Sequence, residues 1–343
     1  MNQVPPFAVV SGAHVHEVLD GHESEVVAAV EAAYRLHGEG QTVNPDSYFL
    51  RFPDRPSSRI IALPASVKGE VGVHGMKWIS SFPQNVAAGI PRASAVLILN
   101  DAETGYPFAC LESSIISAAR TAASAALAAD RIGTARGTRP TRVGFIGVGL
   151  IARYLHTYLA ASGFGFEAIG VHDLSAEHAE GFTGYLRRAE GDDVEITVHD
   201  KAEDLIRASD LVVFATVAGE PHVTDPQWFT HNPLVLHVSL RDLSPEIVLD
   251  SWNAVDDIEH CMKAGTSPHL AEQRVGHRDF VAGTLYDVLA GTITPPADRP
   301  VIFSPFGLGV LDLAVAKYVY DRVAGAGELH TVPGFFHEMK RYG

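Results

Sequence analysis

Three basic side chains lie in otherwise apolar segments of the sequence. Lys77 falls within the strand-like run VGVHGMKWIS, Arg51 falls within YFLRF, and Arg120 lies on the apolar face of an alanine-rich helical pattern. A lysine in such a strand can reach water from a sheet edge, and an arginine on such a helix can pair with a structural acid. The same cations could bind a carboxylate, which a guanidinium contacts through two parallel hydrogen bonds. The residue pattern leaves both interpretations open.

A glycine-rich turn lies in the middle of the chain, within RVGFIGVGLIARYLHTYLAASGFGFEAIGVHD (142–173). The pattern predicts a strand, a tight turn at Gly147 and Gly149, a helix, and a second strand that ends at Asp173. Gly147 permits the sharp turn, and Gly149 lets backbone N–H groups approach a pyrophosphate at the positive end of the helix. Asp173 can accept hydrogen bonds from both ribose hydroxyls and would repel a 2′-phosphate. The segment therefore predicts an NAD-binding βαβ unit.

Another acidic residue follows the apolar run VLHVSL. We expect Asp242 to lie beside the nicotinamide, because ligands of doubly wound sheets bind beyond the carboxyl ends of the strands. Its place before Leu-Ser-Pro is equally suited to a helix cap. Leu150, Ile151, Thr216 and Ser239 complete the predicted cofactor-binding set.

Composition places the chain among ordinary globular proteins with room for two domains. Of its 343 residues, 46% are hydrophobic and 20% are charged. The net charge of −15 argues against nucleic acid or an anionic membrane as a partner, since both select basic surfaces. Two cysteines cannot form a disulfide framework, and the 17 histidines accompany no cluster that predicts a metal site. The N-terminal run MNQVPPFAVV lacks the features of a signal peptide, so we expect a cytoplasmic protein.

The elements that must position these residues fall into two groups. The first group contains an amphipathic helix, extended segments of a mostly antiparallel sheet, and a long alanine-rich helix that Ser113 or Ser114 could cap and that ends near Arg131. The helix spans 23–37, and the extended segments are 47–52, 59–63, 70–80, 93–101 and 107–112. The run 133–141, rich in Gly, Thr, Arg and Pro, predicts the domain boundary.

The second group predicts the sheet that would carry the cofactor. From Arg142 strands alternate with helical patterns, which indicates an α/β fold with a Rossmann-type doubly wound parallel sheet. The predicted strands are 143–146, 167–171, 194–198, 211–216, 234–240 and 254–256. An apolar helix over 310–324 follows.

Four runs of this sequence together resemble the ornithine cyclodeaminase/μ-crystallin family over nearly the whole chain. They are MKWISSFPQN (76–85), ILNDAETGYPFACLESSIISAARTAA (98–123), GFIGVGLIA and VSLRD. The resemblance implies a homodimer whose subunit has a second, α+β domain for substrate binding and dimerisation, formed by 1–133 with 305–343. The NAD-binding Rossmann domain would then span 134–304.

The same resemblance implies roles for individual residues. Arg51, Lys77 and Arg120 match the carboxylate-binding cations of the family, and Asp242 matches its catalytic acid/base, with Lys77 as a second catalytic group. Asp312 matches an acid that follows two glycines near the C-terminus, and Glu112 stands where cyclodeaminases usually have Asp.

The runs KWI and ILNDAETGYP look most like the branch of the family that forms L-2,3-diaminopropionate. This resemblance implies NAD-dependent oxidative cleavage of N-(2-amino-2-carboxyethyl)-L-glutamate to L-2,3-diaminopropionate and 2-oxoglutarate, for siderophore or peptide antibiotic biosynthesis. The alternatives are the redox-neutral cyclisation of ornithine or lysine with loss of ammonia, the reduction of an imine, and non-enzymatic binding of nucleotide and a small ligand, as in μ-crystallin.

Overall fold

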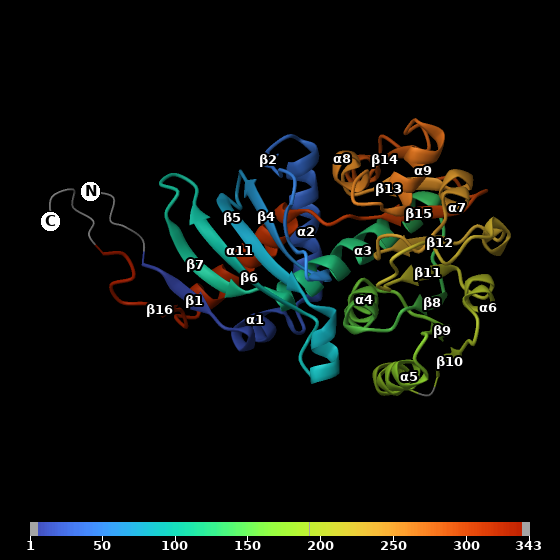
Figure 1. Cartoon of the computed structure of the whole chain (residues 1–343), viewed down its shortest axis with the longest axis horizontal. Helices are drawn as coiled ribbons and strands as arrows, with labels where there is room; N and C mark the ends of the chain where they lie inside the picture. Colours follow the sequence, from blue (N-terminus) through green and yellow to red (C-terminus); the bar gives the residue numbers. More distant parts are fainter. Residues whose placement is uncertain (1–5, 192, 338–343) are drawn as a thin grey trace. The chain divides into compact units, whose positions relative to one another are not determined.

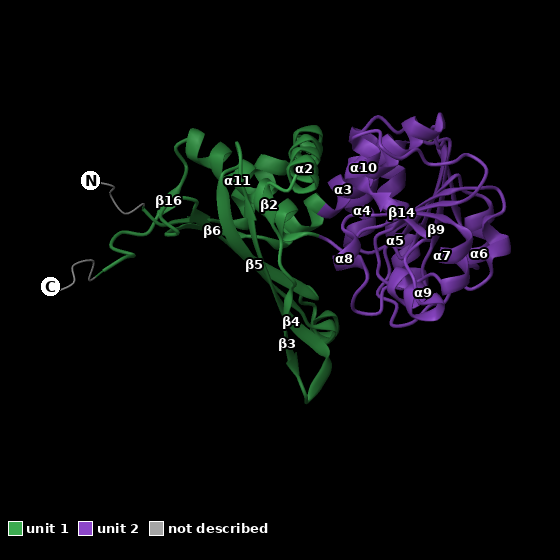
Figure 2. Cartoon of the chain, turned by 90° about the horizontal axis from the view of Figure 1, so that it is seen from above, with its two compact units in different colours: residues 1–120, 308–343 green, residues 121–307 purple. Residues whose placement is uncertain are grey.

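The computed structural model describes residues 6–191 and 193–337, which fold into two compact units (Figure 2). Unit 1 comprises Met1–Arg120 with Leu308–Gly343, and unit 2 comprises Thr121–Gly307. Unit 1 is therefore assembled from two separate segments of the chain, whereas unit 2 is continuous.

Unit 1 is built on an eight-stranded sheet in the order β16-β1-β7-β6-β5-β4-β2, with β3 paired to β4 (Figure 1). The strands are β1 (Ala8–Val10), β2 (Thr42–Val43), β3 (Tyr48–Phe52), β4 (Arg55–Val67), β5 (Val73–Ser81), β6 (Ala93–Asp101), β7 (Pro107–Glu112) and β16 (His330–Thr331). All neighbouring pairs are antiparallel except β1 and β7, so the prediction of a mostly antiparallel sheet is confirmed.

Three α-helices accompany this sheet, together with the 3₁₀ helix η1 (Pro83–Ala88). They are α1 (Gly12–Leu19), α2 (Glu23–Gly38) and α11 (Gly309–Gly325). Helix α11 packs on β4, β5 and β6 and also contacts α1 and α2 (Figure 1). Every residue from Gly309 to Ala316 is buried, which explains why this stretch is apolar on all sides. Asp312 is the one charged residue within it.

Unit 2 contains a parallel sheet of eight strands in the order β10-β9-β8-β11-β12-β15-β13-β14. The strands are β8 (Arg142–Ile146), β9 (Ala168–His172), β10 (Glu195–Val198), β11 (Leu211–Phe214), β12 (Leu234–His237), β13 (Trp252–Val255), β14 (Val281–Thr284) and β15 (Val301–Ser304). From β8 the chain builds outward in one direction through β9 and β10, then returns to place β11 on the other side of β8. The predicted Rossmann-type doubly wound sheet is confirmed.

The connections of unit 2 are mostly helical, as crossovers between parallel strands require. The helices are α4 (Leu150–Ala161), α5 (Ala176–Glu190), α6 (Ala202–Arg207), α7 (Pro245–Asp250), α8 (Ile258–Cys261), α9 (Ser267–Val275), α10 (Leu285–Leu289) and the 3₁₀ helix η2 (Pro226–Phe229). Strands β8, β11, β12 and β15 consist almost wholly of buried residues, so they appear in the sequence as short unbroken apolar runs.

Helix α3 (Ser114–Arg136) begins in unit 1 and continues into unit 2, because the division between the units falls after Arg120. The boundary expected between 133 and 134 lies near the far end of this helix. The helix also extends beyond Arg131, where its end was predicted. Its last residue is anchored within unit 2, since Nη2 of Arg136 donates to the carbonyl oxygen of Asn232 at 3.0 Å.

The N-terminus of α3 is capped by a residue that the sequence analysis did not choose. The carboxylate of Glu112 accepts hydrogen bonds from the backbone N–H groups of Ser114, at 2.7 Å, and Ile115, at 3.2 Å. Ser114 instead uses its hydroxyl to accept from the backbone N–H of Ala95 at 2.9 Å. The acid replaces the predicted serine cap because its charge also opposes the positive end of the helix dipole.

The approach of α11 to β5 depends on a residue without a side chain. A Cβ atom at Gly75 would lie 2.3 Å from the carbonyl oxygen of Ile98 and 2.8 Å from Cδ2 of Leu313. Both distances are shorter than non-bonded carbon contacts allow, so only glycine lets the helix, the strand and β6 pack at this spacing.

We expect Gly75→Ala to lower the free energy of unfolding by about 1–3 kcal/mol, because an added methyl group in a packed interior forces its neighbours apart. Urea unfolding monitored by circular dichroism measures this difference. In the control Gly325→Ala, a Cβ at the end of α11 meets nothing within 4 Å, and the change should stay within about 1 kcal/mol. A Gly75→Ala protein as stable as the parent would contradict this account of the packing.

Candidate active site

In unit 1, two cations share one buried carboxylate. Nζ of Lys77 lies 2.7 Å from Oδ2 of Asp312, and Nε of Arg120 lies 3.0 Å from Oδ1. Lys77 also donates to the hydroxyl of Ser117 at 3.1 Å. The side chain of Asp312 is fully buried, and only 2% of the Lys77 side chain is exposed. The structure therefore brings together Lys77 and Arg120, which the sequence analysis had proposed for one site.

Three elements that are distant in sequence position this cluster. Lys77 lies in β5 between β4 and β6, where it pairs with Leu63 and Leu97, so it is not on a sheet edge. Arg120 lies in the part of α3 that belongs to unit 1, and Asp312 lies in the first turn of α11. The interpretation of Lys77 as an edge lysine that reaches water is therefore wrong.

Burial sets the protonation of Lys77. The pKa of the amine is lowered to about 8, because the effect of burial exceeds the opposing effect of Asp312, and the positive charge of Arg120 adds to the lowering. A lysine with this pKa exchanges its proton close to neutral pH. It can serve both as a charged partner of a carboxylate and as a proton donor or acceptor.

After its internal pairings, the cluster still has unused hydrogen-bond donors and an excess positive charge. Arg120 uses Nε for Asp312, and the described residues give its two Nη groups no partner. These groups can form the paired hydrogen bonds that a carboxylate accepts. With Lys77 protonated, two positive charges face one negative charge. Arg120 thus pairs with a structural acid, as one interpretation expected, and retains donors for a ligand, as the other required.

Arg51 lies on the same face of the sheet as Lys77 but away from the cluster. It pairs with Arg59 of β4, which pairs with Ser81 of β5, and directly opposite residues of a sheet share a face. Ser81 follows Lys77 by four residues, or roughly 13 Å along the strand. Arg51 is exposed, and its guanidinium lies 4.9 Å from the centre of the Phe49 ring. No described ion pair joins it to Asp312, so it could contact only a different group of an extended ligand.

In unit 2, the predicted glycine turn connects β8 to α4. Gly147 has a φ of +80°, and a Cβ there would lie 2.9 Å from the carbonyl group of Ala215. A Cβ at Gly149 would meet nothing within 4 Å, and no side chain of the described residues caps α4. The start of the helix, with the N–H groups of Leu150 and Ile151, therefore has no capping side chain and has open space at Gly149, as pyrophosphate binding requires.

Asp173 follows β9 beside this turn. One carboxylate oxygen accepts from the backbone N–H of Val148 at 3.0 Å, and the other accepts from the N–H of Ser175 at 2.9 Å. The carboxylate therefore fixes the glycine turn, a role that the sequence analysis had not anticipated. Each oxygen retains a lone pair that a ribose hydroxyl could use.

Exposed apolar side chains follow the same strands and provide a test of whether a dinucleotide fits. Leu174 after β9 is 100% exposed, Val217 after β11 is 76% exposed, and Leu150 at the turn is 57% exposed. Exposed apolar side chains that gather at one site can mark a ligand-binding groove. The open turn, the acid and these side chains together fit an adenine dinucleotide.

A second network in unit 2 surrounds Asp242, whose side chain is fully buried. Oδ1 accepts a short hydrogen bond from the hydroxyl of Thr216 and lies 3.0 Å from Nε2 of His222. Oδ2 accepts from the hydroxyl of Ser239 at 2.5 Å and lies 3.3 Å from Nε2 of His237. Thr216 and Ser239, predicted to bind cofactor, thus hold the carboxylate of Asp242.

Burial alone would raise the pKa of Asp242, but the hydrogen bonds from His222 and His237, the charge of His237 and the bond from Ser239 hold it well below its usual range. The carboxyl group therefore stays ionised. It does not cap the next helix, because Ser244 is the N-cap residue of α7. The helix-cap interpretation of Asp242 is wrong.

The glycine turn and the Asp242 network of unit 2 meet at Thr216. A Cβ at Gly147 would lie 2.9 Å from Cγ2 of Thr216, so this residue touches the glycine turn while its hydroxyl binds Asp242. The two histidines of the network were missed by the sequence analysis. His237 left a signal, a polar residue inside the apolar run VLHVSL, whereas His222 lies in a loop without a recognisable pattern.

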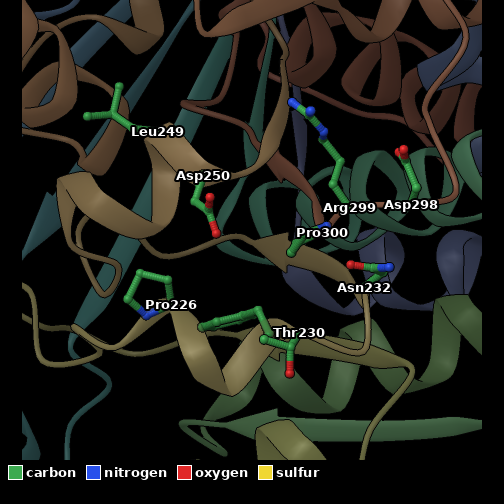
Figure 3. Close-up of a pocket in the computed structure, with 9 residues that line it drawn as sticks. Pro226, Thr230, Asn232, Leu249, Asp250, Asp298, Arg299 and Pro300 are labelled. Atoms are coloured by element: carbon green, nitrogen blue, oxygen red, sulfur yellow. The ribbon is translucent and has the colours of Figure 1, made fainter.

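A separate surface pocket lies at the amino ends of the strands of this sheet, before the first residues of β12, β13 and β15 (Figure 3). It is lined by Pro226, Phe229, Thr230, Asn232, Leu249, Asp250, Asp298, Arg299 and Pro300. Because the glycine turn and Asp242 follow carboxyl ends of strands, this pocket is not part of the dinucleotide site. Within the described residues, no group of three or more His, Cys, Asp or Glu side chains could hold a metal ion, and no helix could cross a membrane.

The doubly wound sheet, the open glycine turn and the acid after β9 define a protein of the Rossmann-type dinucleotide-binding class. A model of the ornithine cyclodeaminase/mu-crystallin family matches residues 9–327, and the chain belongs to this family.

Proteins of known name are similar over most of the chain. N-((2S)-2-amino-2-carboxyethyl)-L-glutamate dehydrogenase of Staphylococcus aureus is 27% identical over 316 residues, which cover 89% of this chain and 92% of that protein. An archaeal alanine dehydrogenase dimer with bound NAD is 26% identical, with a TM-score of 0.84 and coverage of 96% and 99%. The fold is also that of Delta(1)-pyrroline-2-carboxylate reductase of Thermococcus litoralis, at 23% identity, a TM-score of 0.85 and coverage of 95% and 100%. These relatives support an oxidoreductase and the predicted NAD cofactor.

The pKa of Lys77 leads to a prediction about ligand binding. A carboxylate such as 2-oxoglutarate binds best to the protonated amine, so its affinity should fall above pH 8, by up to about tenfold per pH unit. Titration calorimetry between pH 7 and 9.5 measures this. Lys77→Met should bind weakly at every pH, whereas Lys317→Met, which removes a partly exposed lysine paired with Asp321, should behave as the parent. Affinity that is flat across this range in the parent would refute the role of Lys77.

The carboxylate of Asp173 leads to a prediction about the cofactor. Like charges about 4 Å apart repel by up to about 4 kcal/mol near a protein surface, so NADH should bind at least about tenfold more tightly than NADPH. Asp173→Asn removes the charge and should reduce this preference. Fluorescence titration of both cofactors provides the two dissociation constants, and equal values for the parent would exclude the proposed contact with the ribose.

Proposed function

We propose that this protein catalyses the NAD-dependent oxidative cleavage of N-(2-amino-2-carboxyethyl)-L-glutamate to L-2,3-diaminopropionate and 2-oxoglutarate. The observation that carries the proposal is the buried cluster of Lys77, Arg120 and Asp312, which retains one positive charge and unused guanidinium donors. Such a cluster suits one carboxylate of a small substrate. The relative from Staphylococcus aureus that bears this substrate in its name supports the choice.

The arrangement of cations in unit 1 favours a substrate with several carboxylates. Lys77 and Arg120 bind the α-carboxylate of the glutamyl part, which holds the carbon to be oxidised. Arg51 binds a second carboxylate further along the same face of the sheet, where Arg59 is its neighbour. Ornithine and lysine each have only one carboxylate, so they would leave Arg51 unused and would need an acid for their terminal ammonium group.

Unit 2 would hold the oxidant. The N–H groups at Gly149, Leu150 and Ile151 would hold the pyrophosphate of NAD, and Asp173 would hold the adenosine ribose. When bound, NAD would supply the acceptor for a hydride from the α-carbon of the glutamyl part. The nitrogen of the secondary amine loses a proton, so the carbon–nitrogen single bond becomes an imine.

Hydrolysis of the imine completes the reaction. Water adds to the imine carbon, the carbon–nitrogen bond breaks, and the products are a 2-oxo acid and a primary amine. The sequence analysis proposed Lys77 and Asp242 for the proton transfers of this step. The burial of Lys77 keeps its pKa close to the range in which such transfers are efficient.

We propose that the protein is a homodimer. The face of the unit 1 sheet opposite Lys77 has a row of exposed apolar side chains, in which Tyr48, Trp78 and Val96 occupy matching positions on β3, β5 and β6. They are 70%, 39% and 43% exposed, which suits a face covered by a second copy. The dimer of the similar alanine dehydrogenase supports this. We place the enzyme in the cytoplasm, in siderophore or peptide antibiotic biosynthesis.

The cofactor distinguishes this reaction from cyclodeamination. Oxidative cleavage leaves the hydride on the cofactor, so NADH should accumulate one-for-one with 2-oxoglutarate when N-(2-amino-2-carboxyethyl)-L-glutamate is added. A cyclodeaminase returns the hydride to its own intermediate and releases ammonia. The absorbance of NADH, measured with parallel assays of 2-oxoglutarate and ammonia, distinguishes the two reactions. Ammonia from ornithine or lysine at constant NADH would refute the proposal.

A further inference from the structure

One imidazole of the Asp242 network faces outward. His222 is 40% exposed, and its Nε2 lies 3.0 Å from Oδ1 of Asp242. Its other ring nitrogen, Nδ1, has no hydrogen-bond partner among the described residues. The second imidazole, that of His237, is 1% exposed and is held between Asp242 and the hydroxyl of Ser304. Among the groups that contact Asp242, His222 therefore supplies an imidazole that a substrate could reach.

The position of this imidazole is fixed by backbone as well as by side chain. The N–H groups of His222 and Val223 both donate to the carbonyl oxygen of Asp242, each at 3.0 Å. Val223 also forms a bridge with Leu243. These contacts join the loop after β11 to the loop after β12 at Asp242. The residue whose carboxylate binds the imidazole therefore also holds the backbone of His222 in place.

The network also selects the tautomer of His222. Asp242 is ionised and accepts hydrogen bonds from Thr216 and Ser239, so it acts only as an acceptor. Nε2 of His222 must then carry the hydrogen, and the lone pair of the neutral ring is on Nδ1. A buried carboxylate that orients an imidazole in this way is the arrangement that enzymes use for proton transfer.

The imidazole lies beyond the carboxyl end of a strand, on the side of the sheet where ligands bind. His222 follows β11, which is adjacent to β8, and the strand order reverses between these two strands. Ligands of doubly wound sheets bind in the crevice outside this point. Thr216 touches both Asp242 and the glycine turn at Gly147, so the histidine network is continuous with the dinucleotide site.

We propose that His222 exchanges protons with the substrate in the hydrolytic step and that Asp242 positions it. The inference rests on the proposed function. Nδ1 takes a proton from water as the oxygen bonds to the imine carbon, and the pair of electrons of the C=N bond moves to nitrogen. The imidazolium returns this proton to nitrogen. Nδ1 then takes the hydroxyl proton while the C=O bond forms and the C–N bond breaks, and the departing amine receives that proton.

The first experiment measures turnover of N-(2-amino-2-carboxyethyl)-L-glutamate with NAD. His222→Ala should lower kcat by about 100-fold or more, as expected for loss of a general acid–base group, while the Kd for NADH and the Tm stay at the parent values. Added imidazole should restore part of the activity. The matched control is His277→Ala, which removes another exposed imidazole paired with a carboxylate, that of Asp279 at 3.4 Å, and it should behave as the parent.

Asp242 is tested by combining substitutions. If Asp242 acts through His222, the double variant His222→Ala/Asp242→Asn should be no slower than His222→Ala alone. A further loss of about tenfold or more in the double variant overturns the positioning role. Parent activity in His222→Ala overturns the role of His222, and so does activity lost in His222→Ala but fully kept in His222→Gln, because glutamine preserves a hydrogen bond without exchanging protons.

A second measurement needs no turnover. NADH should slow the modification of His222 by diethyl pyrocarbonate, read by peptide mass spectrometry, and should leave His277 unaffected. Equal rates at His222 with and without NADH overturn the inference. If the parent forms no NADH from this substrate but NADH protects His222, the proposed substrate fails while the placement of His222 at the cofactor stands.

Discussion

Unit 1 depends on one buried carboxylate, that of Asp312, which pairs with two cations. Asp312 joins α11 to Lys77 of β5 and Arg120 of α3 through hydrogen bonds of 2.7 and 3.0 Å. Removing one partner from a buried ion pair leaves an uncompensated charge and costs about 3–5 kcal/mol. Asp312 is therefore needed for the three elements to pack without an unpaired buried charge. The same positive charge that remains after pairing makes the cluster suited to an anionic ligand, so stability and binding use the same side chains.

The architecture of unit 2 could be predicted from sequence because its strands are buried on both faces. Such strands leave short apolar runs, and the glycine turn between β8 and α4 gave their order. The strands β14 and β15 were missed. Val281–Thr284 is only partly buried and includes a glycine, and Val301–Ser304 lies close to a proline-rich stretch that resembles a loop. Helix α1 was missed because its histidines obscure the apolar spacing of Val15 and Leu19.

Side-chain partners were harder to predict than elements. Lys77, Arg120 and Asp242 could be identified as unusual because they are charged residues next to apolar runs. Nothing in the spacing indicates that Lys77 and Asp312, 235 residues apart, share a hydrogen bond, or that His222 reaches Asp242. Such contacts depend on how loops close at a sheet edge and on the register of a returning helix. The family resemblance pointed to Asp312, whereas the pattern of the residues did not.

The two-segment composition of unit 1 has a consequence for how the chain folds as it leaves the ribosome. Unit 2 is continuous and can fold as soon as Thr121–Gly307 has emerged. The sheet of unit 1 is synthesised earlier but lacks α11 and the countercharge of Asp312 until the segment from Leu308 onward has been made. Through most of translation Lys77 and Arg120 therefore have to remain hydrated, and the first part of the chain completes its fold last.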